Sequence, residues 1–523
     1  MTMHPEFTVH RLLDNAVELD PDKVAIVEGG KEYTYEELAR SSAALSAALM
    51  DAGVGKGDRV GVYLEKSWEA VVAMLAASQA GAAFVNINPL LKSPQVQYIV
   101  GDCDVRALIG DFGRLEALEP GMVGTAFYKG DKPSTGIAGS LVDLAEVLRQ
   151  GSDSYPERTV LETDLGTILY TSGSTGLPKG VATSQRNLVV GAQIVSTYLE
   201  NSKEDRILSA LPFSFDYGLN QLMTSLRVGA TLILQSSAFP GDLLRGLRRH
   251  EATGLAGVPP LWALLLRSAK GLEEQPLEHL RYITNSGGRI PQANLDELRR
   301  LLPNTKIYLM YGLTEAFRST YLPPEEIDRG TECIGKPIPN TEILVINKDG
   351  QEAAAGEVGE LVHRGPTVAW GYWGKEEETL KAYRPHPFAP PELLIEEKVV
   401  YSGDLVRRDE KGYLYFVGRE DNMIKTQGYR LSPEEVENLL VSTGIVREAC
   451  AFAVPDPDLG QQVLAVVSLR DGGEESLEPI REYCVKNAPP YMVPKEIFIE
   501  NELPKTPSGK IDRQMVKNAY ANR

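Results

Sequence analysis

Apolar and polar residues follow two alternating periods along the first hundred residues of the chain. Residues 59–64 and 83–87 are short, mainly apolar runs typical of buried strands. The stretch 68–80 between them repeats apolar residues at helical spacing and ends at Gly81. A strand, a helix and a second strand in this order predict parallel strands joined by a right-handed crossover.

The same pattern predicts further elements on both sides of this unit. Two β-prone runs, 25–27 and 33–35, flank Gly29-Gly30 and indicate a hairpin. Other elements are predicted as helices at 36–50 and 242–250 and as strands at 231–234 and 281–284. Ser172 and Asn285 each follow a predicted strand, and binding loops of parallel sheets lie at the carboxyl ends of strands. These two residues are therefore expected to line one crevice.

The pattern changes in the second half of the chain. From about 334 to 415 short strands with frequent Gly and Pro predict a β-rich region. Residues 412–417 are a predicted strand, 418–422 a polar linker, and Ser432-Pro433-Glu434-Glu435 opens a helix with an N-cap, an early Pro and acids at its positive end. The last hundred residues are thus expected to form a separate small domain.

A Gly- and hydroxyl-rich loop follows the apolar run 167–170. Its ten residues are Thr171-Ser172-Gly173-Ser174-Thr175-Gly176-Leu177-Pro178-Lys179-Gly180. Glycines allow backbone N–H groups to turn toward an anion, hydroxyls add donors, and Lys179 supplies charge. The loop therefore predicts a phosphate site, although it lacks the Gly-Lys-Ser/Thr tripeptide of the P-loop NTPases.

Composition and charge limit the class of protein. The chain has 523 residues, 43% of them hydrophobic and 24% charged, which suits a globular protein with at least two domains. A net charge of −18 argues against nucleic acid or an anionic membrane as the main partner. Four scattered cysteines and six scattered histidines argue against a disulfide framework and a histidine-built metal site. No run long enough to span a membrane and no signal peptide is seen, so a cytoplasmic location is expected.

Five motifs in one order identify a family. The ten-residue loop resembles the signature of the adenylate-forming enzymes, which are acyl-CoA synthetases, adenylation domains of nonribosomal peptide synthesis, and luciferases. The other four matching segments are Tyr311-Gly312-Leu313-Thr314-Glu315, Tyr401-Ser402-Gly403-Asp404, Gly418-Arg419 through Lys425-Thr426-Gln427-Gly428-Tyr429-Arg430, and Pro507-Ser508-Gly509-Lys510. The resemblance implies a large N-terminal α/β domain with a β-rich subdomain, residues 1–420, followed by a small, mobile α+β domain, residues 421–523.

This resemblance implies ATP-dependent activation of a carboxylic acid as an acyl-adenylate. Such chemistry places the carboxylate in line with the α-phosphate and stabilises the charge that builds there. Glu315 is the implied Mg²⁺ ligand, Thr314 contacts the α-phosphate, Tyr311 stacks on adenine, Asp404 and Arg419 hold the ribose, and Lys510 serves the adenylation step. The remaining residues of the predicted ATP site are Thr171, Ser172, Gly173, Ser174, Thr175, Gly176, Lys179, Gly287, Gly288, Arg289, Met310 and Gly312.

A second half-reaction with a thiol is also implied. In the family the small domain rotates about a hinge, and Asp421 stands at the matching position. Lys425 and Gly428 would then replace Lys510 and admit a pantetheine arm, for which Gly428 permits close backbone approach. The implied acceptor is the phosphopantetheine of a carrier protein or CoA.

The acid pocket departs from the common CoA-ligase pattern. Many such ligases carry His where this chain has Phe215, and the pair Phe215-Asp216 resembles amino-acid adenylation domains, in which the Asp binds the substrate ammonium. A buried Asp needs a partner, and a helix N-terminus or an internal Arg would serve equally well. Arg318 could bind a second carboxylate of the acid or pair with Asp216. The other predicted wall residues are Tyr217, Asn220, Gly257, Asn285, Ser286, Met310 and Ser319.

Two hypotheses within the family and one outside catalysis follow. The chain is similar to stand-alone enzymes that load β-amino acids in macrolactam pathways and to acyl-CoA ligases tied to exosortase loci. The leading hypothesis is adenylation of an amino acid, with a β-amino acid favoured, and transfer to a carrier protein. The alternative is an AMP-forming acyl-CoA ligase for a non-amino acid. A catalytically silent AMP-binding protein is disfavoured because Lys179, Glu315, Asp404 and Lys510 are all present.

Overall fold

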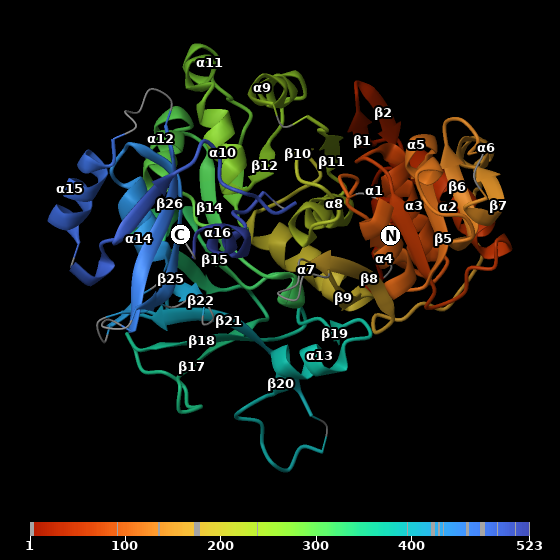
Figure 1. Cartoon of the computed structure of the whole chain (residues 1–523). Coiled ribbons are helices and arrows are strands. Elements are labelled where there is room, and N and C mark those ends of the chain that lie inside the picture. The colour runs from red at the N-terminus through yellow and green to blue at the C-terminus, as the bar shows by residue number, and fades with distance from the viewer. Residues whose placement is uncertain are drawn as a thin grey trace. The chain divides into compact units, whose positions relative to one another are not determined.

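A computed structural model of the chain divides into two compact units (Figure 1). It describes residues 5–91, 93–133, 136–171, 178–237, 239–394, 396–419, 424–426, 429–431, 433–456, 460–470, 476–488, 490–507 and 509–521. The first unit contains Met1–Leu344 and Val362–Tyr401, and the second contains Val345–Leu361 and Ser402–Arg523. The predicted domain boundary at 420/421 falls in residues outside the described part and stays a prediction.

One sheet of the first unit carries the predicted strand–helix–strand unit. Its strand order is β19-β9-β8-β4-β3-β5-β6-β7, and the strands from β8 to β7 pair in parallel. Their bounds are β3 Arg59–Tyr63, β4 Ala83–Asn86, β5 Val105–Asp111, β6 Val123–Lys129, β7 Ala138–Asp143, β8 Leu165–Thr171, β9 Lys179–Ser184 and β19 Gly371–Tyr372. The helix α3 (Trp68–Gln79) joins β3 to β4 as predicted and is buried on all sides, which explains its apolar residues on every face.

A second, mostly parallel sheet carries several of the predicted pocket residues. Within the first unit its order is β16-β15-β14-β13-β12-β10-β11-β1-β2. The bounds are β1 Val24–Glu28, β2 Lys31–Thr34, β10 Arg206–Ser209, β11 Thr231–Leu234, β12 Gly254–Gly257, β13 Tyr282–Asn285, β14 Lys306–Tyr311, β15 Thr320–Leu322 and β16 Cys333–Pro337. The strands β11, β10, β12, β13 and β14 run parallel, so their carboxyl ends share one edge.

Helices with apolar faces join the two sheets into one core. Residues of β1, β3, β5 and β11 share a single buried cluster with helices α1, α2, α3, α7 and α8. The helices of this unit are α1 Val9–Leu19, α2 Tyr35–Asp51, α4 Ser93–Asp102, α5 Phe112–Glu116, α6 Leu144–Gln150, α7 Gln185–Tyr198, α8 Asp216–Val228, α9 Pro240–Arg249, α10 Pro259–Leu266, α11 Ala269–Glu274, α12 Gln292–Leu301 and α13 Glu376–Ala382. Burial of both helix faces and sheet faces in this cluster supplies the main stabilisation of the unit.

Several element boundaries differ from the sequence expectation, three of them with a clear local reason or a bearing on the site. The hairpin of β1 and β2 is confirmed, but Tyr35 begins α2 instead of ending the strand, because Thr34 caps that helix in a capping box with Glu37. Helix α9 starts at Pro240, which suits the first helical position. Asn285 is the last residue of β13 and does not follow it.

The β-rich region is confirmed by a series of strands in this part of the sequence. They are β17 Glu342–Ile346, β18 Val358–Arg364, β20 Tyr383–Pro385, β21 Lys398–Arg408 and β22 Leu414–Arg419, with short 3₁₀ helices earlier at Thr314–Ala316 and Pro324–Arg329. The strand β22 extends two residues beyond the predicted end at 417, so Arg419 belongs to the ladder and not to a linker.

The rest of the second unit is an α+β fold with its own buried clusters. Its elements are β23 Ile424–Thr426, β24 Tyr429–Leu431, α14 Pro433–Val441, β25 Val446–Asp456, β26 Gly460–Leu469, α15 Glu478–Asn487, a 3₁₀ turn Pro490–Met492, β27 Glu496–Ile499 and α16 Arg513–Tyr520. The helix predicted after residue 432 is confirmed as α14, with Pro433 as its first residue.

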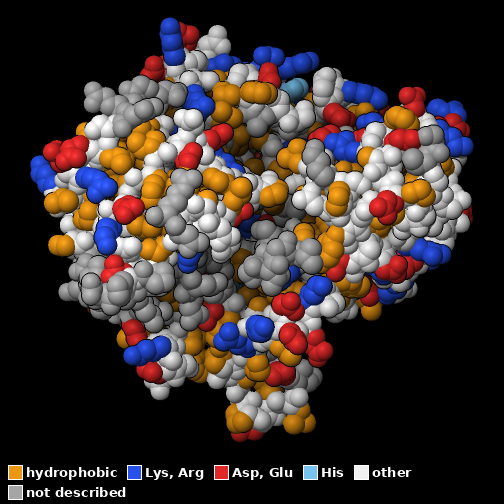
Figure 2. Space-filling view, in the orientation of Figure 1, with side chains coloured by type: hydrophobic (Ala, Val, Ile, Leu, Met, Phe, Trp, Pro, Cys, Tyr) orange, Lys and Arg blue, Asp and Glu red, His pale blue; other side chains and the backbone are white. Residues whose placement is uncertain are grey.

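The described surface carries charges of both signs, and the cysteines lie in the interior. Figure 2 shows Lys and Arg side chains interspersed with Asp and Glu, and exposed apolar side chains such as Phe388, Leu393 and Leu394 lie in the loop between β20 and β21. All four cysteines are buried free thiols. Within the described residues no helix is both long and apolar enough to cross a membrane.

Candidate nucleotide and acid site

The two ends of the predicted phosphate loop are held together by a β-ladder. Thr171 at the end of β8 lies opposite Lys179 at the start of β9, and its hydroxyl donates to the Lys179 carbonyl at 3.5 Å. Ser172, Gly173, Ser174, Thr175 and Gly176 lie outside the described residues. The strands therefore fix where the loop begins and ends, and they bring the Lys179 ammonium to that point.

A residue that the sequence analysis missed connects Lys179 with Glu315. Tyr372, in the two-residue strand β19, pairs with Val181 of β9, and its hydroxyl donates to Glu315 Oε1 at 2.7 Å. The Lys179 Nζ lies 5.3 Å from the centroid of the same ring, within cation–π range. The Glu315 carbonyl also accepts the Ala369 N–H at 2.9 Å. Two residues far apart in the sequence, both predicted to serve ATP, thus contact one tyrosine.

The predicted adenine residue Tyr311 ends β14 and lies beside a buried histidine. Its ring is nearly parallel to that of His363, with centroids 6.1 Å apart. Burial lowers the pKa of His363 to about 3, so the imidazole is neutral at physiological pH. Neither ring nitrogen of His363 has a hydrogen-bond partner among the described residues. Gly312 follows in the loop, and Thr314 begins the short 3₁₀ helix that contains Glu315.

The turn after β13 is built by Asn285. The indole N–H of Trp262 donates to Asn285 Oδ1 at 3.0 Å, and Asn285 Nδ2 donates to the Gly288 carbonyl at 3.0 Å. Gly287 has a φ of +76°, which glycine adopts without strain. Arg289 is tied to Thr331 and Glu332 by bonds of 2.9 and 3.0 Å. Both ends of the Asn285 amide therefore shape this turn.

A small cavity of about 20 Å³ lies beside α8 and the neighbouring strands. Its lining residues are Val195, Leu199, Ile207, Tyr217, Asn220, Gln221, Thr224, Ala256, Tyr282, Thr284 and Met310. Three of the predicted wall residues, Tyr217, Asn220 and Met310, are in this set. A volume of this size holds about one water molecule. Asn220 Nδ2 and both amide atoms of Gln221 are buried with no hydrogen-bond partner among the described residues.

The predicted pair Asp216 and Arg318 is brought together at the start of α8. Asp216 is the first residue of that helix, and its Oδ2 lies 3.6 Å from Arg318 Nη1. The Arg318 side chain is 2% exposed and that of Asp216 15%. The Arg318 guanidinium carbon lies 4.7 Å from the centroid of the Tyr217 ring. Of the two roles considered for Arg318, the ion pair with Asp216 is present in this structure.

The other predicted wall residues surround these elements. Ser286 is buried at the end of β13 and donates its N–H to the Gly257 carbonyl at 3.3 Å. A side chain at Gly257 would clash with Trp262 at 2.4 Å. Ser319 is wholly buried, and its hydroxyl has no partner within the described part of the chain.

The remaining predicted residues belong to the second unit. Asp404 of β21 is buried and lies opposite Arg419 of β22 in the antiparallel ladder, and its N–H donates to Ser402 Oγ at 3.1 Å. Lys425 lies in β23 opposite Arg430 of β24. Lys510 is exposed, and its carbonyl accepts the Thr506 N–H at 2.8 Å. Asp421 and Gly428 lie outside the described residues.

A bound Mg²⁺ would fit the first unit only together with phosphates. In the described ranges no group of three or more His, Cys, Asp or Glu side chains could hold a metal ion. Mg²⁺ is commonly held by one or two carboxylates plus substrate phosphate oxygens and water. The single carboxylate of Glu315, oriented by Tyr372 beside Lys179, suits that kind of binding.

Comparison with known proteins identifies the family. Residues 13–373 match the model of the AMP-binding enzyme family, and residues 435–510 match that of the AMP-binding enzyme C-terminal domain. The chain is 31% identical over 512 residues to Bacitracin synthase 3 of Bacillus licheniformis, covering 97% of this chain but 8% of that protein. It is 29% identical to Delta-poly-L-ornithine synthetase of Acinetobacter baumannii, covering 98% of this chain and 37% of that protein.

Solved structures of similar proteins agree over nearly the whole chain. The complex of the anthranilate CoA ligase AuaEII with anthranoyl-AMP has a TM-score of 0.87, 25% identity and coverage of 99% of this chain and 98% of that one. The o-succinylbenzoate CoA synthetase of Bacillus subtilis with ATP and magnesium has a TM-score of 0.83, 26% identity and coverage of 99% and 100%. The chain belongs to the AMP-binding enzyme family and is an AMP-forming ligase of the adenylate-forming superfamily.

Proposed function

We propose that the chain adenylates a small carboxylic acid with ATP and transfers the acyl group to a pantetheine thiol. The observation that carries this proposal is the meeting of Lys179 and Glu315 on Tyr372, because it unites the exit of the phosphate loop with a carboxylate suited to Mg²⁺. Relatives of both kinds support it, since the similar proteins include peptide synthetases and CoA ligases.

The proposed first step is an in-line displacement. A carboxylate oxygen of the acid attacks the α-phosphorus of ATP, the bond to pyrophosphate breaks, and acyl-AMP forms. Lys179 and the hydroxyls of the loop hold the β- and γ-phosphates, Thr314 contacts the α-phosphate, and Lys510 stabilises the charge that develops. Bound Mg²⁺ supplies further neutralisation of the triphosphate. In the second step the thiol attacks the acyl carbon and AMP leaves.

The favoured acid carries an amino group, and a β-amino acid suits the resemblance best. Asp216 stands at the N-terminus of α8, where a carboxylate is stabilised by the helix dipole. Its distance of 3.6 Å from Arg318 is longer than a hydrogen bond. A carboxylate has about four lone-pair positions, so the ion pair with Arg318 does not by itself exclude a contact with a substrate ammonium. The proposed acceptor is the phosphopantetheine of a carrier protein.

A second candidate is a CoA ligase for a non-amino acid. It is favoured by the same ion pair, because Arg318 already supplies Asp216 with a cation. A substrate amine is then unnecessary for the charge of Asp216 to be compensated.

The test is acid-dependent exchange of pyrophosphate into ATP across amino acids and their des-amino analogues. Exchange confined to amino-bearing acids, and lost in Asp216→Asn, supports the amino-acid proposal. Equal exchange with the des-amino analogues supports the second candidate. Mass spectrometry of products formed with CoA or with a phosphopantetheinylated carrier then identifies the acceptor. Absence of exchange with every acid would refute the proposed function.

A further inference from the structure

Arg318 is a buried cation that uses little of its hydrogen-bonding capacity. Its side chain is 2% exposed, yet its one ion pair, to Asp216, spans 3.6 Å and engages Nη1. The Nε and Nη2 atoms are buried with no hydrogen-bond partner among the described residues. A buried charged donor left unsatisfied costs free energy, so such groups are expected to have a partner that is part of the working complex.

The two unused atoms lie on the same edge of the guanidinium. In an arginine side chain Nε–H and one N–H of Nη2 are parallel, and this edge matches the two oxygens of a carboxylate. The Nη1 side of the guanidinium already contacts the chain. Nη1 faces Asp216, and a Cβ added at Gly312 would lie 3.5 Å from it. The plane itself is covered by the ring of Tyr217. The edge that has no hydrogen-bond partner among the described residues is the one suited to a bidentate anion.

A strained backbone turn places Arg318 in this position. Phe317 has φ +53° and ψ −44°, and the Arg318 N–H donates to the Ala316 carbonyl at 2.6 Å. This combination is the rare γ-turn with a positive φ, which a bulky residue adopts only at a cost. The turn is held because the Phe317 side chain is wholly buried and fills the space above Gly191, where an added Cβ would clash at 2.5 Å. The Thr367 hydroxyl bonds the Arg318 carbonyl at 3.2 Å.

We propose that Arg318 determines the substrate class by binding a second carboxylate of the acid through its Nε–Nη2 edge. The inference rests on the proposed function, because the first carboxylate is the one adenylated. Asp216 and Arg318 together are neutral, so a second carboxylate adds one negative charge to the site. An amino group of the same acid near Asp216 restores neutrality, so an amino dicarboxylic acid is the favoured substrate.

The experiment compares dicarboxylic acids with matched monocarboxylic acids. The panel contains malonic to adipic acid with and without an amino group, each beside the acid of equal length in which a methyl group replaces the second carboxylate. Acid-dependent pyrophosphate release gives kcat and KM for each. We expect at least about a 100-fold preference in kcat/KM for one dicarboxylic acid over its methyl partner, because a site built for a polar group rejects the analogue that lacks it.

Variants distinguish recognition from a structural role. Arg318→Met is expected to lower kcat/KM for the preferred dicarboxylic acid about 100-fold and for its methyl partner by less than about 5-fold, abolishing the preference. Arg318→Lys keeps the charge and loses the fork, so it should retain part of the preference. Arg281→Lys is the control, because Arg281 pairs with Asp205 and is not among the predicted pocket residues. This variant should keep the full preference.

The outcomes separate the two proposals. The inference is overturned, and the proposed function left intact, if the natural chain uses a methyl-terminated acid as well as its dicarboxylic partner. It is also overturned if the full preference survives in Arg318→Met or in Arg318→Lys. Should Arg318→Met fail to fold, Arg318→Lys and the natural chain still decide the question. Absence of pyrophosphate release with every acid refutes both proposals.

Discussion

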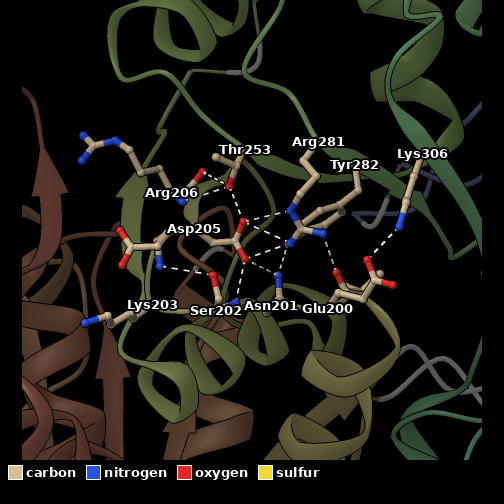
Figure 3. A network of polar contacts seen from close by, with 12 residues as sticks. Glu200, Asn201, Ser202, Lys203, Asp205, Arg206, Thr253, Arg281, Tyr282 and Lys306 are labelled. Atoms are coloured by element: carbon tan, nitrogen blue, oxygen red, sulfur yellow. Dashed lines mark hydrogen bonds and ion pairs between the residues drawn. The ribbon is translucent and has the colours of Figure 1, made fainter.

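Two arginine–aspartate pairs of the same sheet use their charges in opposite ways. In the pair Asp205–Arg281 the arginine Nη2 lies 2.8 Å from Oδ2 and 3.1 Å from Oδ1, and Nε lies 3.3 Å from Oδ1. Thr253 and the N–H of Ser202 add bonds of 2.6 and 2.9 Å to the same carboxylate (Figure 3). In the pair Asp216–Arg318 one contact of 3.6 Å joins the groups. The first pair is satisfied within the chain, whereas Arg318 of the second pair has two donor atoms, Nε and Nη2, without a partner among the described residues.

Their positions on the sheet account for this difference. Asp205, Thr253 and Arg281 each stand directly before a strand, β10, β12 and β13, at the amino edge of the parallel sheet. Asp216 follows β10 and Arg318 follows β14, at the carboxyl edge, where open α/β sheets bind ligands. The arginine is 31% exposed in the first pair and 2% in the second, so the deeper charge is the less satisfied one.

The largest effect is expected from breaking the structural pair. Arg281→Met leaves the Asp205 carboxylate, 4% exposed, without its cation. Removal of one partner of a buried pair costs about 3–5 kcal/mol of unfolding free energy. Urea denaturation measures this loss, and Arg281→Lys serves as the conservative control. A loss below about 1 kcal/mol would place this pair among surface ion pairs instead.

A smaller loss is expected at Thr253, which joins the same network. Its hydroxyl donates to Asp205 and accepts the Arg206 N–H at 3.0 Å. Thr253→Val removes both bonds from a half-buried group and should cost about 1–2 kcal/mol in the urea experiment. Thr197→Val, at an exposed position of α7, is the matched control and should change stability by less than about 0.5 kcal/mol. Equal effects at the two positions would contradict the network.

The structural pair also predicts a dependence on pH. Burial alone would raise the pKa of Asp205, but the bonds from Thr253, Arg281 and the Ser202 N–H outweigh it and hold that pKa below its usual value. The group therefore contributes stability above the pKa of the unfolded chain, about 3.9, and this contribution is lost as the pH falls through the lower pKa of the folded state. Urea midpoints measured between pH 7 and pH 3 should fall less steeply in Asp205→Asn than in the natural chain. Parallel curves would contradict the assignment.

The smallest change in stability is expected at Arg318. Arg318→Met keeps the buried stem and removes a contact of 3.6 Å together with two unsatisfied donors, and Asp216 keeps the helix dipole of α8. The unfolding free energy should change by less than about 1 kcal/mol. A loss above about 3 kcal/mol would make Arg318 a structural residue like Arg281 and remove the contrast between the pairs.

Local sequence patterns predicted much of the fold because its strands and helices follow their own periods. The unit β3–α3–β4, the hairpin of β1 and β2 and the start of α14 are set by apolar spacing, glycines and caps within a few residues. The β propensity of Tyr35 predicts a strand, but the capping box of Thr34 begins helix α2 at this residue. The family motifs supplied the nucleotide residues, whose roles stay predictions.

Site contacts that depend on the pairing of strands far apart in the sequence could not be predicted. Tyr372 lies in a two-residue strand, too short for a periodic signal, and its contact with Glu315 depends on pairing with β9. Gln221 follows Asn220 on α8 and lines the same cavity, and a helical projection from Asp216 could have included it. The open edge of Arg318 depends on a positive φ at Phe317, and no residue type in that segment signals such a turn.

The γ-turn at Phe317 fixes the distance between two predicted site residues, Glu315 and Arg318. The proposed metal ligand Glu315 and Arg318 are three positions apart in the sequence, and three such steps span at most about 11 Å between Cα atoms. If Glu315 serves the reacting end of an acid and Arg318 its far end, both contacts come from one short segment of backbone. The length of this turn then limits the length of the acid that can contact both residues. A single inserted residue would change which acids fit, while Lys179 and the strands that carry it stayed as they are.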